Sequence, residues 1–126
     1  MCSFGKEQNR LRNFKVVSKL QSKVKLYFKF PLEFNDHTRV PDEMFVKTKN
    51  FFMINYEGLT VSGTSIGYWS HFGIEYKDET VEYFALIDKN KFLKTIKPKL
   101  MKHIKKFEKE FKQIEILCYY HNVIST

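Results

Sequence analysis

Five side chains of this sequence could act on a phosphate-containing or nucleotide substrate. They supply one hydroxyl, one indole, one amide and two carboxylates: Thr60, Trp69, Glu79, Gln113 and Glu115. Carboxylates can transfer protons, and the other groups can hold the polar parts of a small molecule. The five lie in separate stretches of the chain, so they form a site only if the fold brings them to one pocket.

Trp69 closes the most unusual segment, residues 57–69, which holds three of the five glycines and the only tryptophan. Glycine adopts backbone conformations that other residues avoid, so we expect a bulge or turn near residues 62–65. This bulge is predicted to carry Trp69 into the core. The alternative is a nest of amides around Thr64-Ser65 that binds an anion. The segment lacks the Gly-Lys-Ser/Thr end of a phosphate-binding P-loop.

The histidines and cysteines show no spacing typical of a metal site. The sequence has four histidines and two cysteines, with no Cys-x-x-Cys pair. We therefore predict neither a metal nor a cofactor. His71, near Trp69, Glu75 and Asp78, could serve as a general acid or base, although most single loop histidines are simply solvated.

The positive charge of the chain is concentrated in one segment. Of the formal net charge of +8, residues 88–112 contribute +7, from ten lysines against three acids. Seven of these lysines are candidate anion-binding residues on a predicted helix: Lys94, Lys97, Lys99, Lys102, Lys105, Lys106 and Lys109. They could bind the phosphates of a nucleic acid or an acidic protein surface. The other interpretation is an ordinary solvated helix face. The absence of arginine from residues 88–112 argues against specific phosphate recognition there.

Hydrophobic periodicity predicts four strands. The first covers residues 23–30, where every second residue is apolar and belongs to a covered face: Val24, Leu26, Phe28 and Phe30. Further strands are expected over residues 59–69, 79–87 and 114–123. The second and third should form an antiparallel hairpin that reverses at residues 70–73.

Two helices are predicted between these strands. One starts at Pro41 and ends near Tyr56, with Gly58 as its left-handed cap. The other begins after Asp88, whose carboxylate can cap it, and Pro98 should break or kink it near residues 96–97. Its apolar stripe consists of Phe92, Leu93, Ile96, Leu100, Ile104, Phe107 and Phe111.

The order β-α-β-β-α-β predicts a ferredoxin-like α+β domain. Two right-handed crossovers would place both helices on one face of a four-stranded antiparallel sheet with the strand order 4-1-3-2. The opposite face would stay open. Its predicted surface residues are Lys25, Tyr27, Lys29, Leu117, Tyr119 and His121. This open face could pair with a second copy of the chain, as a homodimer, or stack nucleic-acid bases.

Length and composition fit a single domain. With 126 residues, of which 43% are hydrophobic and 17% aromatic, the chain can bury a core. We expect the domain to span residues 23–126 after a basic, partly mobile arm, residues 1–22. No apolar run reaches the ~20 residues that span a bilayer, and the first residues lack an apolar signal segment. We therefore expect a cytoplasmic protein without a membrane partner.

Four short motifs carry a resemblance to known proteins: Tyr56-Glu57-Gly58-Leu59-Thr60, Gly67-Tyr68-Trp69, Asp78-Glu79 and Phe111-Lys112-Gln113-Ile114-Glu115-Ile116. On these motifs the chain resembles a family of small, uncharacterised bacterial and phage proteins. The resemblance covers roughly residues 23–124 and implies the same compact α+β fold, without an activity to transfer. Two positions depart from the pattern. Glu57 replaces a glycine and Ile114 replaces an acid, so any chemistry that this acid performs in relatives is lost here.

Three functional hypotheses remain open, of which the last is a structural homo-oligomer that binds no small ligand. The first is a small cytoplasmic binding protein, dimeric through its open sheet face, that uses the lysine-rich helix against nucleic acid or an acidic protein. Its short, lysine-rich, cofactor-free chain fits a phage or mobile-element origin. The alternative is a small enzyme with its site near the hairpin of residues 58–69. A pocket in which the five candidate side chains meet would favour the enzyme.

Overall fold

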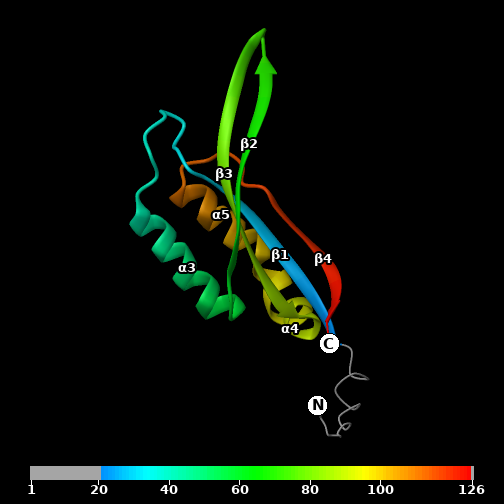
Figure 1. Ribbon diagram of the computed structural model, residues 1–126. Helices are drawn as coiled ribbons and strands as arrows, with labels where there is room; N and C mark the ends of the chain where they lie inside the picture. The colour runs from blue at the N-terminus through cyan, green and yellow to red at the C-terminus, as the bar shows by residue number, and fades with distance from the viewer. Residues whose placement is uncertain (1–20, 126) are drawn as a thin grey trace, which may run out of the picture.

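The computed structural model describes residues 21–125, in which a four-stranded antiparallel sheet is covered on one face by helices (Figure 1). This arrangement confirms the predicted α+β class. The elements are β1 (Gln21–Pro31), α3 (Asp42–Tyr56), β2 (Thr60–His71), β3 (Ile74–Asp88), α4 (Lys89–Lys91), η1 (Phe92–Ile96), η2 (Lys97–Lys99), α5 (Leu100–Glu110) and β4 (Cys118–Ser125). The predicted basic N-terminal segment, residues 1–22, lies outside the described residues, except for its last two residues, which belong to β1.

The sheet has the strand order β2-β3-β1-β4, which reads 4-1-3-2 from the β4 edge. All neighbouring strands are antiparallel, and β2 and β3 form the predicted hairpin. The central position of β1 places Phe28 opposite Tyr83 on one side and Cys118 on the other. Burial in this position raises the pKa of the Cys118 thiol to about 12, so the thiol stays neutral.

The covered face of β1 forms the centre of the core. Val24, Leu26, Phe28 and Phe30 are all at most 1% exposed. The ring of Phe28 lies 5.7 Å from Phe52 of α3 and 5.2 Å from Phe107 of α5, between ring centroids. Both helices therefore pack on the same face of the sheet.

The second helix is irregular around Pro98, where a break was predicted. The Asp88 carboxylate accepts a hydrogen bond of 3.2 Å from the Lys91 amide, which confirms the predicted cap. The helix then widens to a π-helical turn in η1 and tightens to a 3-10 turn in η2, which contains Pro98. Proline has no amide hydrogen, so the regular α-helical ladder cannot continue through it. Leu93 is 45% exposed and is not part of the apolar stripe, because it lies about 100° around the helix from buried Phe92.

Three predicted boundaries are wrong. β3 begins at Ile74, five residues before its predicted start at residue 79. The left-handed residue after α3 is Glu57, with φ +62°, rather than Gly58. Its carboxylate accepts a 2.7 Å hydrogen bond from Lys91 and so ties the end of α3 to α4. β4 begins at Cys118 and not at residue 114, and Ile114 is 95% exposed. The neighbouring strand β1 ends at Pro31, which has no amide hydrogen to extend the ladder.

One buried polar pair connects the two helices. The Tyr56 hydroxyl lies 2.7 Å from Nδ1 of His103, which is 8% exposed. Burial lowers the pKa of His103 below its usual value, and the charges of Lys99, Lys102 and Lys106 lower it further. Burial also raises the pKa of Tyr56. Both groups are therefore neutral at pH 7, and the tautomer of His103 decides which of the two donates.

The β2–β3 hairpin extends well beyond the rest of the sheet (Figure 1). β1 pairs with β3 only as far as Thr80, so residues 65–79 form a two-stranded ribbon, here named the arm. The predicted bulge occurs between Val61 and Gly63, where Gly63 has φ +122°. The arm reverses at Phe72 and Gly73, which both have positive φ, as in a type I′ turn.

Candidate functional site

A groove of about 1200 Å³ opens beside the base of the arm. Four parts of the chain line it: the end of β1, the loop that follows β1, the arm, and the segment before β4. The polar and aromatic lining residues are Lys29, Glu33, Phe34, Asn35, His37, Trp69, Glu75, Tyr76, Lys77, Asp78, Glu79, Thr80, Gln113 and Glu115. Such a mixture of aromatic and convergent polar groups is typical of a small-molecule site.

Backbone hydrogen bonds hold the walls of the groove together. The Leu32 amide donates to the Glu79 carbonyl at 3.0 Å, which joins the loop after β1 to the arm. The Lys29 amide donates to the Leu117 carbonyl at 3.0 Å, which joins β1 to the segment before β4. The groove therefore forms where β1 ends and its two neighbouring segments continue past it.

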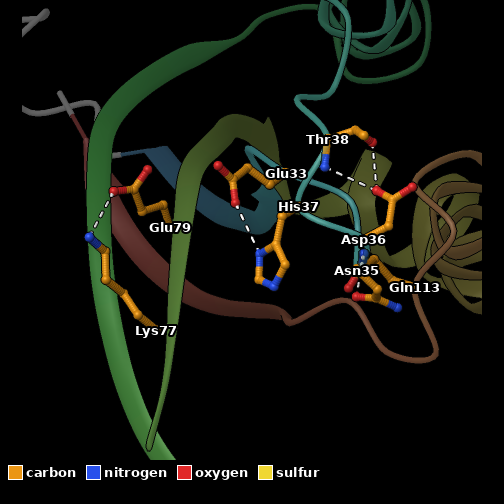
Figure 2. Close-up of polar contacts among 8 residues, drawn as sticks. All are labelled: Glu33, Asn35, Asp36, His37, Thr38, Lys77, Glu79 and Gln113. Carbon is orange, nitrogen blue, oxygen red and sulfur yellow. Dashed lines mark hydrogen bonds and ion pairs between the residues drawn. The ribbon is translucent and has the colours of Figure 1, made fainter.

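Figure 2 shows the polar side chains around the loop after β1. The Gln113 amide lies 3.4 Å from the side-chain oxygen of Asn35. His37 points toward Glu33, with 3.6 Å between Nδ1 and the carboxylate, and Lys77 lies 3.7 Å from Glu79. All of these pairs are solvent-exposed, so each contributes little to stability and leaves its groups free to bind a ligand.

Trp69 and Tyr76 form a stacked pair on the arm. Their ring centroids lie 4.3 Å apart with 16° between the ring planes. The indole N–H donates a 2.8 Å hydrogen bond to Asp78, which fixes the rotation of the ring. Trp69 is 49% exposed, so the prediction that it enters the core is wrong. The arm carries it beyond the helices, where no core lies beneath it.

The groove collects four of the five candidate side chains that the sequence suggested. Trp69, Glu79, Gln113 and Glu115 all line it. Thr60 does not, because it stands at the other end of β2, opposite Phe84. His71 lies against Phe72 at the tip of the arm, with 4.2 Å between ring centroids, and does not line the groove.

The groove is acidic, although the chain as a whole is basic. Five carboxylates and two lysines line it, a net charge of −3 with histidine neutral, compared with +8 for the chain. Within residues 21–125, no three histidine, cysteine, aspartate or glutamate side chains gather closely enough to hold a metal ion. The field of the groove therefore favours a cationic ligand over a phosphate.

Sequence reasoning missed Tyr76, Glu33 and Asn35. A signal for Tyr76 was present: a two-residue turn at Phe72-Gly73 pairs Trp69 directly with Tyr76, as is observed. Glu33 and Asn35 lie in an irregular loop. No periodic pattern indicates where such side chains will lie.

The open sheet face carries an aromatic row across three strands. Tyr27 stacks on Tyr119, with 4.5 Å between ring centroids and 9° between the ring planes, and Phe84 lies 5.3 Å from Tyr27 on the other side. The Tyr119 hydroxyl donates to Glu82, and this hydrogen bond raises the pKa of Tyr119 to about 12. Because the rings contact one another, Tyr27 has no free ring face on which a base could stack. Two other predicted residues of this face lie beside the aromatic row: Lys25 lies over the Phe84 ring, and the His121 ring lies 5.6 Å from Tyr27. Lys29 lines the groove, and Leu117 is 54% exposed.

The seven candidate lysines, here named the lysine ridge, follow η1, η2 and α5. All are exposed except Lys106, which is half-buried and forms an ion pair with Glu110. The Lys97 ammonium also lies 6.0 Å from the ring of Tyr120. The six exposed ridge lysines, Lys97 included, form no ion pair with any residue of the described part of the chain.

Comparisons with known proteins identify a shared fold. No protein-family model matches this chain, and no curated protein matches it. Among solved structures, the chain is similar to a phage SAM lyase in complex with S-methyl-5′-thioadenosine. The identity is 13%, the TM-score is 0.53, and the match covers 84% of this chain and 89% of the other. At this identity the likeness concerns the fold alone. No helix among the described residues is long and apolar enough to cross a membrane.

Proposed function

We propose that this chain is a small enzyme whose groove takes a positively charged adenine-nucleoside substrate, with S-adenosylmethionine as the first molecule to test. The placement of Trp69, Glu79, Gln113 and Glu115 along one groove carries the proposal, with Trp69 and Glu79 on opposite faces of the arm. The fold likeness to a phage SAM lyase that holds S-methyl-5′-thioadenosine supports the substrate class, by analogy. The same likeness supports a phage origin.

The negative charge of the groove favours a cationic substrate over a phosphate-containing one. A phosphate-containing substrate would meet a net charge of −3, in which Lys29 and Lys77 are already counted. S-Adenosylmethionine carries a sulfonium and an ammonium, which carboxylates and aromatic ring faces attract. A cation therefore suits this site better than a nucleotide does.

The groups of the groove suit cleavage at the sulfonium. The bond between sulfur and the amino-acid side chain breaks with its electron pair on sulfur, which becomes the neutral thioether of S-methyl-5′-thioadenosine. The carbon either gains an oxygen nucleophile or loses a neighbouring proton to a base. Glu79 or Glu115 could accept that proton, and the Gln113 amide can hold the amino-acid carboxylate.

This proposal is tested by incubating the purified protein with S-adenosylmethionine and measuring S-methyl-5′-thioadenosine by chromatography. Glu79→Gln or Glu115→Gln should lower the rate by about a hundredfold, whichever residue transfers the proton. Thr60→Val, which changes a side chain outside the groove, should leave the rate unchanged. If the substrate neither binds nor reacts, the proposal is wrong.

The second candidate function is binding of a nucleic acid or an acidic protein by the lysine ridge. The supporting observation is that six exposed ridge lysines have no carboxylate partner within residues 21–125. Lys102, Lys105 and Lys109 are spaced by about one helical turn, so their charges lie along one line that a phosphate backbone can follow.

Titration of a fluorescent oligonucleotide at rising salt measures ridge binding. Replacing Lys102, Lys105 and Lys109 with glutamine should weaken binding and reduce the slope of log K against log salt by about 0.7–0.9 per lost contact. The matched control replaces Lys23, Lys47 and Lys49, which removes the same charge elsewhere. Equal loss in both variants would reflect net charge alone and would contradict a ridge site.

We also propose that the protein is a cytoplasmic homodimer built on a ferredoxin-like fold. The strand order, which reads 4-1-3-2 from the β4 edge, supports the fold class. Exposed apolar side chains on the arm support the pairing: Ile66 is 53% exposed, Tyr68 64% and Phe72 90%. A monomer seldom leaves such a surface uncovered. The arm is a better candidate for the contact than the open sheet face, where aromatic rings already cover one another.

A further inference from the structure

The Trp69–Tyr76 pair combines three properties that rarely occur together on a protein surface. Two aromatic faces are stacked and partly exposed, at 49% for Trp69 and 37% for Tyr76. A carboxylate, Asp78, lies at the indole edge, 2.8 Å from the ring nitrogen. All three residues line one acidic groove.

The geometry points to an onium-binding subsite: we propose that Trp69, Tyr76 and Asp78 recognise the positive centre of a sulfonium or quaternary ammonium ligand. The negative face of an aromatic ring attracts such ions, and tryptophan attracts them most strongly. Onium ions carry no N–H donors, so a hydrogen-bonding pocket offers them little. An aromatic face beside a carboxylate offers both attraction and contact area.

The hydrogen bond from the indole gives Asp78 a second role as a positioning residue. A tryptophan side chain on an exposed two-stranded ribbon would otherwise sample several rotamers. The bond to Asp78 and the stack on Tyr76 together hold one rotamer, so the ring face is set before a ligand arrives. This reduces the entropy lost on binding. The inference rests on the proposed function only in that both use the same groove.

The test uses the intrinsic fluorescence of Trp69, which is the only tryptophan of the chain. The probes are choline, trimethylsulfonium, and 3,3-dimethyl-1-butanol, the neutral carbon isostere of choline. Saturable quenching or enhancement is expected with both cations, at concentrations about tenfold lower than with the neutral isostere. Equal responses to choline and to its isostere would overturn the proposal.

Two variants and one control test the roles of the Asp78 charge and of the second aromatic ring. Asp78→Asn keeps an oxygen acceptor for the indole N–H but removes the charge, and should weaken choline binding by about fivefold. Tyr76→Leu removes the second ring and should weaken it to a similar degree. Glu75→Gln removes a charge elsewhere in the groove and should have less than about a twofold effect. Unchanged affinity in both Asp78→Asn and Tyr76→Leu would overturn the proposal.

The outcomes distinguish this inference from the enzymatic proposal. Choline binding without turnover of S-adenosylmethionine would support the onium subsite and contradict the proposed substrate. Turnover of S-adenosylmethionine that is insensitive to Asp78→Asn and Tyr76→Leu, without choline binding, would support the enzyme and contradict the subsite. Near-ultraviolet circular dichroism of each variant verifies that the aromatic packing of the core is retained.

Discussion

His103 is a titratable side chain whose neutral form the fold requires. Its Nδ1 forms a 2.7 Å hydrogen bond with the Tyr56 hydroxyl, and the ring lies edge-on to Phe51 and has three lysines around it. A proton on this imidazole would bring a charge into the core beside other positive charges. Its pKa in the folded state is therefore lower than its usual value of about 6.5.

This lowered pKa predicts acid sensitivity. The unfolded chain binds the proton as pH falls through about 6.5, while folded His103 resists it, so the free energy of unfolding decreases between that pH and the lower folded pKa. Above pH 6.5 the penalty is absent. Urea denaturation at a series of pH values should show this decrease for the wild type.

His103→Asn provides the matched control, because its side-chain oxygen can accept from Tyr56 without titrating. The decrease in stability between pH 7.5 and 5.5 should be smaller in this variant. Tyr56→Phe should cost about 1–3 kcal/mol near pH 7, because it leaves a buried imidazole nitrogen without a hydrogen-bond partner. Identical pH profiles for His103→Asn and the wild type would contradict the assignment to His103.

At the scale of elements, the arm is the part of the fold with least support. Three or more strands or a packed helix are usually needed to stabilise a ribbon, and residues 65–79 have neither. Its turn adds strain, since Phe72 adopts φ +52°. A left-handed conformation costs a side chain with a Cβ roughly 1–2 kcal/mol, and asparagine much less.

Phe72→Asn is therefore expected to stabilise the arm, because Asn-Gly is the preferred pair for a type I′ turn. The measurement is hydrogen exchange, in which arm amides should gain up to about tenfold in protection. Gly73→Ala should have the opposite effect, since Gly73 has φ +77° and any Cβ there is strained. Lower protection in Phe72→Asn would mean that Phe72 makes contacts in the assembled protein that outweigh the strain.

At the scale of the whole molecule, charge is separated between two surfaces. The groove has a net charge of −3, whereas residues 88–112 carry +7. Such a separation lets one chain attract a cationic small molecule and an anionic macromolecule at different places, without competition between them. Salt should therefore weaken oligonucleotide binding steeply and choline binding only modestly.

The oligomeric state provides the whole-molecule prediction. Light scattering coupled to gel filtration should give about twice the mass of the 15.2 kDa chain. Ile66→Ser with Tyr68→Ser should shift the protein toward monomer if the arm forms the contact, whereas Leu117→Ser should do so if the sheet face does. A wild-type protein that stays monomeric at high concentration would contradict both contacts.

Local patterns were sufficient for much of the fold. Alternation over the first strand identified Val24, Leu26, Phe28 and Phe30 as core residues, because a strand places every second side chain on one face. Asp88 and Pro98 marked the start and the break of the second helix, because capping and a missing amide act within one helical turn. The seven ridge lysines could likewise be listed from the sequence.

Which side chains line the groove could not be predicted from local patterns, because it depends on the tertiary structure. Glu79, Gln113 and Glu115 line one groove because Pro31 ends β1 while β3 and the segment before β4 continue past it. No local pattern encodes how far a strand extends beyond its partner. For the same reason Trp69, which is hydrophobic enough for a core, lies on a ribbon that no helix covers. Short-range interactions determined the elements of this protein and most of its buried face, and only the packing of distant segments decided which side chains share a groove.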